Sequence, residues 1–411
     1  MAEQPKTIGN LNMMRRIHVA HPGTQRGFRV ARILAKDRRF GFFCTTIAFH
    51  PSSILARFFP ARSLEGIPLA KLRRCGQWRE WVNVIGARLP GYGIWKERWW
   101  LSRNRAFGKW VGREVGTQGD VLYGFDTSSC EMFIRGKKRG LKCVLDQSIV
   151  HTVVAERVLA EMAGNRPQYA GSLEGRSCSA KEIERRREEV HLADLIICPS
   201  TQVRDSVIEA GCAPAKAKIV PFGIDLNYFT PGRKIAQAPF RVLFAGAVTQ
   251  RKGIGYLLEA WRATGLRDAE LLIAGDLPSG FDWKPHLPAG ASLLGRVSRE
   301  ALRDLYQTCH CFVFPTMLEG QANVVLEAMA CGCCVVTTPD SGIGDRLRNG
   351  ENGLILQPTH VERWAETLES LSKDRKGVEK MGAAAAESAR DFSLKIYGGR
   401  LVDALKEFLE K

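Results

Sequence analysis

Residues 314–332 read FPTMLEGQANVVLEAMACG, and this stretch points most directly to the fold class of the chain. An apolar strand ends at its start, a loop follows, and the pattern predicts a helix that Asn323 caps and that stops at Gly332. Glu319 would lie in the loop, and Glu327, eight residues on, in the first turns of the helix. Both carboxylates are therefore expected near one helix N-terminus.

This arrangement fits a ligand site and also fits a plain structural cap. Free N–H groups at a helix N-terminus attract phosphate, and carboxylates beside them can accept hydrogen bonds from sugar hydroxyls. A capped helix whose glutamates only complement the helix dipole would have the same spacing. On its own, the stretch leaves both interpretations open.

A second stretch, residues 244–253 (FAGAVTQRKG), carries two adjacent cations. It predicts a strand that ends at Gly246, a loop with Arg251 and Lys252, and a helix that begins near Ile254. Cations fixed at the carboxyl end of a strand can neutralise a diphosphate leaving group. Two solvated loop cations would produce the same pattern, so this stretch alone is also ambiguous.

Short β-rich apolar runs alternate with helical stretches along the chain, which is the pattern of parallel α/β domains. Residues 223–239 (GIDLNYFTPGRKIAQAP) interrupt both periodicities with turn formers and two prolines. The sequence therefore predicts one α/β domain over residues 1–222 and a second over residues 223–391. Open sheets of this kind bind ligands at the carboxyl ends of their strands, and two that face each other form a cleft.

Composition excludes several protein classes. With 411 residues, 45% of them hydrophobic and 25% charged, the chain is expected to be an ordinary globular protein of two or three domains. No apolar run reaches the roughly 18 residues of a membrane span, and the first residues lack a signal-peptide core, so a cytoplasmic protein is expected. The twelve cysteines lack the paired C-x2-C loops of a zinc site, so free thiols and no metal are expected.

The net charge of +17 is unevenly distributed. Residues 1–240 contain 39 basic and 21 acidic side chains, and residues 57–113 alone contain 13 basic side chains, 3 acidic ones and six of the nine tryptophans. Basic residues interleaved with tryptophan suit anionic lipid, nucleic acid or another polyanion, and a solvated basic face is the plain alternative. Because no nucleic-acid-binding signature is present, we expect an anionic membrane surface as the partner of Arg57–Arg113 and no nucleic acid.

Taken together, the motifs occur in the order typical of one enzyme family. A strand is followed by G-x5-KG, and then come LLIAGD (271–276), LGRVSREALRDLY (294–306), the E-x7-E element (319–327) and NGENGLIL (349–356). The chain resembles the retaining, family-4-type glycosyltransferases (glycosyl transferases group 1), most strongly over residues 190–360. The resemblance implies the GT-B architecture, an α/β fold of two Rossmann-like domains facing across a cleft, with a C-terminal helix (392–411) that returns to the first domain.

The resemblance also implies a function. A cytoplasmic enzyme, peripheral on the inner face of the plasma membrane, would move a hexose from a nucleoside-diphosphate sugar (UDP- or GDP-linked) to a hydroxyl with retention of configuration. The acceptor would be a sugar, a lipid-linked sugar or a polysaccharide, in cell-surface polysaccharide or glycolipid synthesis, and no cofactor or metal would be required. A nucleotide-sugar 2-epimerase of the same architecture and a non-catalytic nucleotide-sugar-binding protein remain as alternatives.

The family's motifs assign roles to individual residues. By resemblance, Glu327 would hold the donor ribose, Glu319 would face the transferred sugar, and Arg251 and Lys252 would take the diphosphate. Many relatives have Phe-Gly after the first glutamate and Arg after the strand-end glycine, where this chain has Gln321-Ala322 and Ala247. The further donor-binding residues implied are Gly23, Gly246, Gly295, Arg296, Val297, Gly320, Gln321, Ala322 and Asn323.

The N-terminal half contributes weaker candidates. The loop HPGTQRG (21–27) resembles the family's glycine-bearing loop, so Gly23 could approach the donor phosphate, and His21 is a further candidate. Relatives often place a histidine in the sugar pocket, and the segment VLDQSIVH (144–151) offers His151 as a catalytic residue. Gln147 lies nearer the aligned position, and a structural histidine at a helix start would also explain His151.

Overall fold

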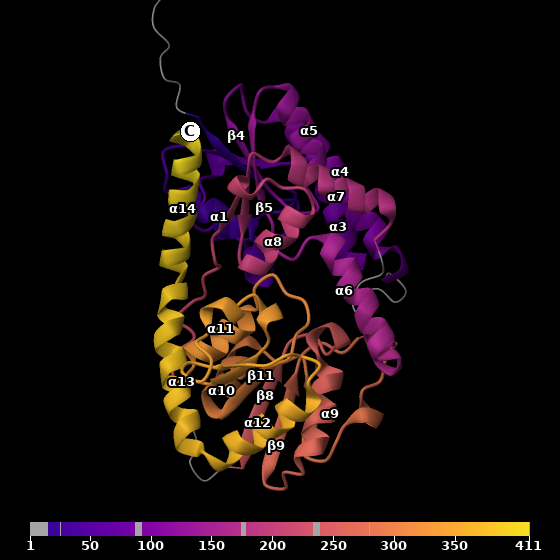
Figure 1. Cartoon of the computed structure of the whole chain (residues 1–411). Helices are drawn as coiled ribbons and strands as arrows, with labels where there is room; N and C mark the ends of the chain where they lie inside the picture. The colour runs from indigo at the N-terminus through magenta and orange to yellow at the C-terminus, as the bar shows by residue number, and fades with distance from the viewer. Residues whose placement is uncertain are drawn as a thin grey trace, which may run out of the picture. The chain divides into compact units, whose positions relative to one another are not determined.

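The computed structural model describes residues 15–24, 26–86, 93–173, 178–232, 239–278 and 280–410 (Figure 1). It contains two parallel sheets: a seven-stranded sheet of order β3-β2-β1-β4-β5-β6-β7 and a six-stranded sheet of order β10-β9-β8-β11-β12-β13. Helices follow most of the strands, which confirms the predicted α/β class. None of the helices in the described ranges is long and apolar enough to cross a membrane.

Two compact units are distinguished by their internal contacts. The N-terminal unit comprises residues 1–146, 188–196 and 405–411, and the C-terminal unit comprises residues 147–187 and 197–404, as far as they are described. The predicted boundary at 222/223 follows β7 and precedes β8, and it stays a prediction.

The central strand of the seven-stranded sheet is β4 (Val121–Phe125). β4 and β5 pair residue for residue, from Val121 with Lys142 to Phe125 with Asp146. Every residue of β4 is buried, because strands of a parallel sheet are covered on both faces and read as continuous apolar runs. The strands are β1 (Ile17–Ala20), β2 (Phe40–Thr45), β3 (Leu72–Arg74), β4 (Val121–Phe125), β5 (Lys142–Asp146), β6 (Leu195–Cys198) and β7 (Ala217–Ile219).

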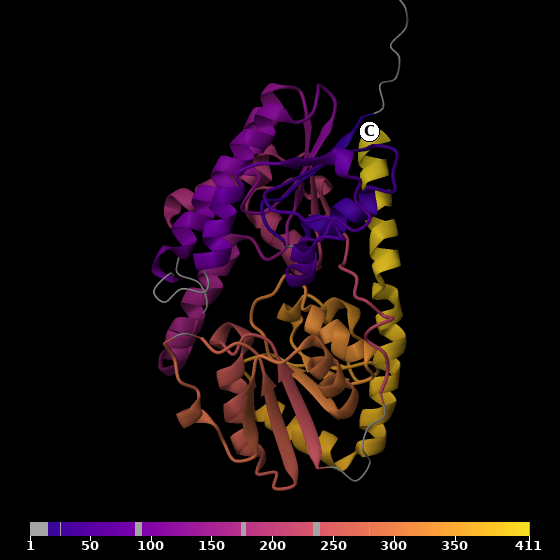
Figure 2. The ribbon, with the colours of Figure 1, turned by 180° about the vertical axis from the view of Figure 1, so that it is seen from behind.

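The helices α3 and α4 both belong to the N-terminal unit. In both views α4 runs beside α5 (Figures 1 and 2). The helices are α1 (Gly27–Leu34), α2 (Ile54–Phe58), α3 (Gln77–Gly86), α4 (Gly93–Glu114), α5 (Cys130–Lys138), α6 (Thr152–Asn165), α7 (Ala180–Leu192) and α8 (Thr201–Glu209).

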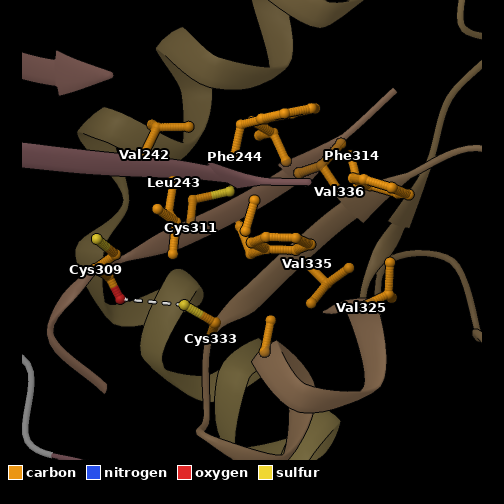
Figure 3. Packing of buried hydrophobic residues seen from close by; sticks show 14 of the residues in the cluster. Val242, Leu243, Phe244, Cys309, Cys311, Phe314, Val325, Cys333, Val335 and Val336 are labelled. Atoms are coloured by element: carbon orange, nitrogen blue, oxygen red, sulfur yellow. Dashed lines mark hydrogen bonds between the residues drawn. The ribbon is translucent and has the colours of Figure 1, made fainter. Parts of the chain in front are cut away.

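The six-stranded sheet forms the centre of the C-terminal unit. Its core is built from apolar side chains of β8, β11 and β12, including Val242, Phe244, Phe314 and Val336 (Figure 3). The strands are β8 (Phe240–Ala245), β9 (Ala269–Ala274), β10 (Ala291–Gly295), β11 (Cys311–Phe314), β12 (Cys334–Thr337) and β13 (Leu354–Ile355). The helices are α9 (Ile254–Thr264), α10 (Arg299–Thr308), α11 (Asn323–Ala330), α12 (Val361–Lys373), α13 (Arg375–Ala389) and α14 (Leu394–Glu410).

The clustered cysteines belong to this core. All twelve cysteines are free thiols, and Cys309, Cys311 and Cys333 are buried. The Cys333 thiol donates to the carbonyl of Cys309 at 3.3 Å (Figure 3). In the described ranges, no group of three or more His, Cys, Asp or Glu side chains is arranged to hold a metal.

Candidate functional site

Glu319 and the two predicted cations form one ion-paired cluster in the C-terminal unit. Arg251 Nη1 lies 3.4 Å from Glu319 Oε1, and Lys252 Nζ donates to the same oxygen. Thr316 Oγ1 donates to this oxygen as well, at 3.2 Å, and Glu319 is only 9% exposed. The sequence predicted these three residues as a site, and the structure brings them together as a shielded carboxylate with two cations.

The backbone holds this cluster in place. Arg251 and Lys252 lie in a short 3-10 turn that ends at Gly253, whose φ is +74°. A Cβ at Gly253 would lie 1.9 Å from the carbonyl oxygen of Pro315, so only glycine allows the two loops to approach this closely. The Met317 N–H donates to the Arg251 carbonyl at 3.1 Å, which joins the loop after β8 to the loop after β11.

The helix that follows begins differently from the prediction. Ala322, and not Asn323, occupies the N-cap position of α11, without a side-chain cap, so the prediction that Asn323 caps the helix is wrong. The reason is that the Ala322 N–H donates to the Ser341 carbonyl at 2.9 Å. This hydrogen bond holds Ala322 in the N-cap position, one residue before the predicted cap. This amide is therefore not free for a donor molecule, and Asn323 Oδ1 is buried without a hydrogen-bond partner in the described structure.

Gly320 and Gln321 are fixed by contacts that the motif did not reveal. A Cβ at Gly320 would lie 1.9 Å from the Ser148 carbonyl oxygen, and the Gly320 carbonyl accepts from Ser200 Oγ at 2.7 Å. The Gln321 side chain accepts from the Phe222 N–H at 2.8 Å and donates to the Phe222 carbonyl at 3.1 Å. Gln321 therefore ties the loop after β11 to Phe222, which directly precedes residues 223–239.

Glu327 lies further along α11 and is half-buried. Its Oε2 accepts from the Tyr306 hydroxyl at 3.4 Å, and burial raises the pKa of that hydroxyl well above its usual value. Tyr306 therefore remains protonated and donates to the carboxylate. This contact is compatible with a carboxylate held ready for a ligand and with a purely structural pair.

Glycines line the carboxyl ends of β8, β9 and β10. The Gly246 N–H donates to the Ala274 carbonyl at 2.9 Å, and the Gly275 N–H donates to the Gly295 carbonyl at 2.8 Å. A Cβ at Gly275 would lie 1.6 Å from the Gly246 carbonyl oxygen. Gly275 was not among the predicted residues, although the glycine of the LLIAGD motif was the signal that could have identified it.

The predicted donor-binding residues that follow Gly295 are more open. Arg296 is largely exposed, and its Nε lies 3.5 Å from Asp276 Oδ1. Val297 is half-buried and packs against the core of the unit. In this segment, the sheet therefore holds the Gly295 carbonyl and the core holds the Val297 side chain, whereas the Arg296 side chain is open to solvent.

His151 acts as the N-cap of α6. Its Nδ1 accepts from the Val153 N–H at 3.4 Å, and its own backbone N–H donates to Ser206 Oγ at 2.9 Å. Burial lowers the pKa of the imidazole to about 4, so at neutral pH the ring is uncharged with its proton on Nε2. The alternative candidate Gln147 is buried too, and its Nε2 donates to the Ile149 carbonyl at 2.9 Å.

In the N-terminal unit, the glycine-bearing loop borders a small polar cavity. The Gly23 N–H donates to His21 Nδ1 at 2.9 Å, which holds the turn of the loop. The cavity, of about 150 Å³, is lined by His21, Gly23, Thr24, Glu80, Trp100, Arg103 and Asn104. Most of these side chains can form hydrogen bonds, and Trp100 adds one aromatic surface.

Buried ion pairs that the sequence did not predict lie beside this cavity. Glu80 is 3% exposed and pairs with Arg62 and Arg103 through its two oxygens. Nearby in the same unit, Arg26 Nη2 lies 2.5 Å from Asp146 Oδ1. These partners are 18 to 120 residues apart in the sequence, so spacing alone could not have revealed them.

Comparisons with known proteins agree with the predicted family. Residues 239–374 match the family model described as "Glycosyl transferases group 1". The D-inositol 3-phosphate glycosyltransferase of Rhodococcus jostii (strain RHA1) is 28% identical over 266 residues, which cover 59% of this chain and 57% of that protein. The same-named protein of Mycobacterium sp. (strain KMS) is 30% identical over 261 residues, covering 59% and 56%. This chain thus matches less than two thirds of the length of these relatives.

Solved structures share the fold at low sequence identity. Sucrose-phosphate synthase from Thermosynechococcus elongatus superposes with a TM-score of 0.66 at 16% identity, covering 96% of this chain and 99% of that one. Anabaena Alr3699/HepE, in complex with UDP and glucose, gives a TM-score of 0.59 at 15% identity, with coverage of 96% and 100%. These similarities confirm the predicted GT-B type of fold.

Proposed function

We propose that this chain is a retaining glycosyltransferase, because residues 239–374 match the family model described as "Glycosyl transferases group 1". It would move a hexose from a nucleoside-diphosphate sugar to a hydroxyl group, in the synthesis of a cell-surface polysaccharide or glycolipid. The observation that carries this proposal is the cluster in which Glu319 holds Arg251 and Lys252 beside the start of α11.

The cluster suits a reaction in which a diphosphate leaves. When the bond between the anomeric carbon and the diphosphate oxygen breaks, the electron pair stays on the diphosphate, and negative charge grows there. Arg251 and Lys252 would stabilise this charge, because they are already ordered and shielded from water. The acceptor oxygen would then attack on the same face of the sugar, and its proton would pass to the leaving diphosphate.

Glu319 has two tasks in this proposal. Without a donor, it neutralises the two cations, whose burial would otherwise be unfavourable. With a donor bound, the cations would turn toward the diphosphate, and the freed carboxylate oxygen would accept a hydrogen bond from a hydroxyl of the sugar. Because protein cations and backbone amides would supply the electrostatic stabilisation, the proposal requires no metal.

Similar proteins suggest which donor and which acceptor class to test first. The Anabaena protein forms complexes with UDP and with UDP-glucose, which supports a UDP-sugar as the first donor to test. GDP-sugars remain the second choice. The name of the curated relatives supports a phosphorylated cyclitol or sugar as one acceptor class to include.

The test follows the fate of a labelled donor. The protein is incubated with UDP- or GDP-hexose and a panel of acceptors, and NMR then records the released nucleotide and the anomeric configuration of the product. Transfer with retained configuration is expected. Inversion at C2 of the sugar without an acceptor would point to an epimerase, and binding without turnover would point to a non-catalytic protein.

We further propose that the chain works at the inner face of the plasma membrane, attached reversibly through residues 57–113. Exposed apolar side chains in this region support the proposal, among them Phe58 at 73% and Trp78 at 57% exposed. Basic residues in the same region would be attracted to anionic lipid, at roughly 1 kcal/mol for each one near the surface.

A further inference from the structure

α4 presents two different faces. One face is buried and includes Phe107 and Val111, and glycines let it pack closely on α5. A Cβ at Gly112, for example, would lie 2.7 Å from Arg135 Cβ and 3.0 Å from Met132 Cα. The other face has Arg98, Ser102, Arg105 and Lys109 at spacings of four, three and four residues, which places them in one stripe along the helix.

This stripe lines a cavity together with α3. The cavity has a volume of about 450 Å³, and its lining includes Arg79 from α3 and the four stripe residues. Arg79 Nη1 donates to Ser102 Oγ at 2.8 Å, which turns its guanidinium toward the stripe. No acidic side chain is among the described residues that line this cavity.

Four cations around one cavity indicate an anionic ligand. Arg105 and Lys109 are like charges four residues apart on α4, and negative charge that enters the cavity would offset the repulsion between them. Guanidinium groups match phosphate oxygens in two parallel hydrogen bonds, which a phosphate can accept from several sides at once. The cavity therefore fits a phosphate group better than a carboxylate.

Two exposed tryptophans that contact cations of the cavity lining favour a lipid as the source of this phosphate. Trp78 and Trp95 are 57% and 53% exposed, and each lies under a cation of the cavity lining. The Arg79 guanidinium is 4.5 Å from the Trp78 ring centroid, and the Arg98 guanidinium is 5.4 Å from the Trp95 ring centroid. Exposed tryptophans beside cations are typical of proteins that sit at a bilayer interface, whereas a small soluble phosphate would not need them.

Further apolar surface adjoins α3. Phe59, directly after α2, packs edge-on against Trp81 of α3 at 6.0 Å between ring centroids. α2 carries the exposed Ile54 and Phe58, so the apolar side chains of α2 and α3 belong to neighbouring elements of one unit. An area that combines a phosphate-sized basic cavity with exposed apolar side chains matches the chemistry of a lipid headgroup and its adjoining acyl region.

We propose that the cavity between α3 and α4 binds the phosphate of an anionic phospholipid headgroup. Arg79, Arg98, Arg105 and Lys109 hold the phosphate, and Trp78 and Trp95 insert at the bilayer interface. This site deepens the membrane attachment proposed above by naming the residues and the ligand. It is independent of the transfer chemistry, because none of these residues belongs to the ion-paired cluster of Glu319, Arg251 and Lys252.

The test uses sedimentation of the full chain with vesicles of phosphatidylcholine, with and without phosphatidylglycerol. The variant Arg98→Gln/Lys109→Gln removes two cations of the cavity, both on exposed side chains. We expect its partition coefficient on anionic vesicles to fall about 30-fold, from roughly 1 kcal/mol per cation. The matched control Lys36→Gln/Arg38→Gln removes two exposed cations of the same unit and should change binding far less.

Two further variants separate the contributions. Arg98→Lys/Lys109→Arg keeps both charges and should retain vesicle binding. Trp78→Ser/Trp95→Ser should weaken binding but leave its salt dependence unchanged, whereas the Gln variant should reduce the salt dependence. Transfer to a water-soluble acceptor should be the same in all four variants, so a failure of the membrane site is distinguishable from a failure of the proposed reaction.

Several results would overturn the proposal. Equal losses of vesicle binding in the Gln variant and its control would mean that diffuse positive charge, and not the cavity, attracts the lipid. Binding to vesicles of phosphatidylcholine alone would exclude the phosphate of an anionic lipid as the determinant. Calorimetric binding of inorganic phosphate without vesicle binding would assign the cavity to a soluble phosphate ligand, and tighter binding to RNA than to vesicles would assign it to nucleic acid.

Discussion

The cations after β8 and the cations on α4 are held in opposite ways. Arg251 and Lys252 are shielded, paired with Glu319 and fixed by a glycine turn. Arg98 and Lys109 are exposed and line a cavity without an acidic side chain among its described residues. In the roles proposed above, ordered and neutralised cations would stabilise a charge that develops in a reaction, whereas exposed cations would attract a charged surface.

The N-terminal unit also contains buried ion pairs, and removal of their shared carboxylate is expected to have the largest effect on stability. Glu80→Gln should leave Arg62 and Arg103 uncompensated and lower the free energy of unfolding by about 3–5 kcal/mol. The matched control is Glu366→Gln, which breaks the exposed pair with Arg363 at 2.8 Å and should cost less than about 1 kcal/mol. Urea denaturation of both variants measures the two effects, and similar losses would contradict the distinction between buried and exposed pairs.

A change of pH should affect a buried neutral group and leave the arginines charged. The pKa of His151 is about 4 in the folded protein, below the unfolded value of 6.5, so the unfolded chain binds more protons between these pH values. The stabilisation from this group is therefore complete above pH 6.5 and declines as the pH falls toward 4, by up to about 3 kcal/mol.

Denaturation at several pH values checks this expectation. His151→Asn, which preserves a capping side chain, should flatten the slope between pH 4 and 6.5. An unchanged slope in the variant would mean that His151 is not responsible for the pH dependence. Vesicle binding through the arginines of α4 should vary little over the same range, because arginine keeps its charge.

Removal of the paired cations should slow the chemical step. Arg251→Ala and Lys252→Ala should each reduce kcat by about ten- to a hundredfold, because a hydrogen bond to a charged group contributes roughly 1.5–3 kcal/mol and this one strengthens in the transition state. Since the two residues share Glu319, their effects need not add. Steady-state kinetics decides the matter, and an intact kcat in both variants would mean that these are merely structural cations.

The smallest effect is expected at Glu327. The donor ribose does not change during the reaction, so Glu327→Ala should raise KM about tenfold and leave kcat almost unchanged. Glu327→Gln, which can still accept from Tyr306, controls for loss of that contact. A fall in kcat with an unchanged KM would contradict the assignment of Glu327 to the ribose.

Sequence motifs predicted the strand ends well and the contacts between them poorly. Gly246, Arg251 and Glu319 were identifiable because each stands at a fixed distance from a strand or a helix start. The ion pair between Lys252 and Glu319 joins residues 67 positions apart, and no local pattern reports such a contact.

The cap of α11 and the role of Gln321 show the same limit. Asn323 has the right residue type for a cap, but the hydrogen bond from Ala322 to Ser341 decided where the helix begins. The sequence marked Gln321 as a departure from the family, and only the tertiary structure reveals that its amide is bound to both polar groups of the Phe222 backbone.

The glycines of the C-terminal unit have a genetic consequence. At Gly253, Gly275 and Gly320, an added Cβ would meet a main-chain oxygen at 1.9, 1.6 and 1.9 Å, respectively. A mutation at another position can shorten a side chain but cannot remove a carbonyl group from the main chain. Loss-of-function alleles at these three codons should therefore have no simple second-site suppressors, and revertants should restore glycine itself.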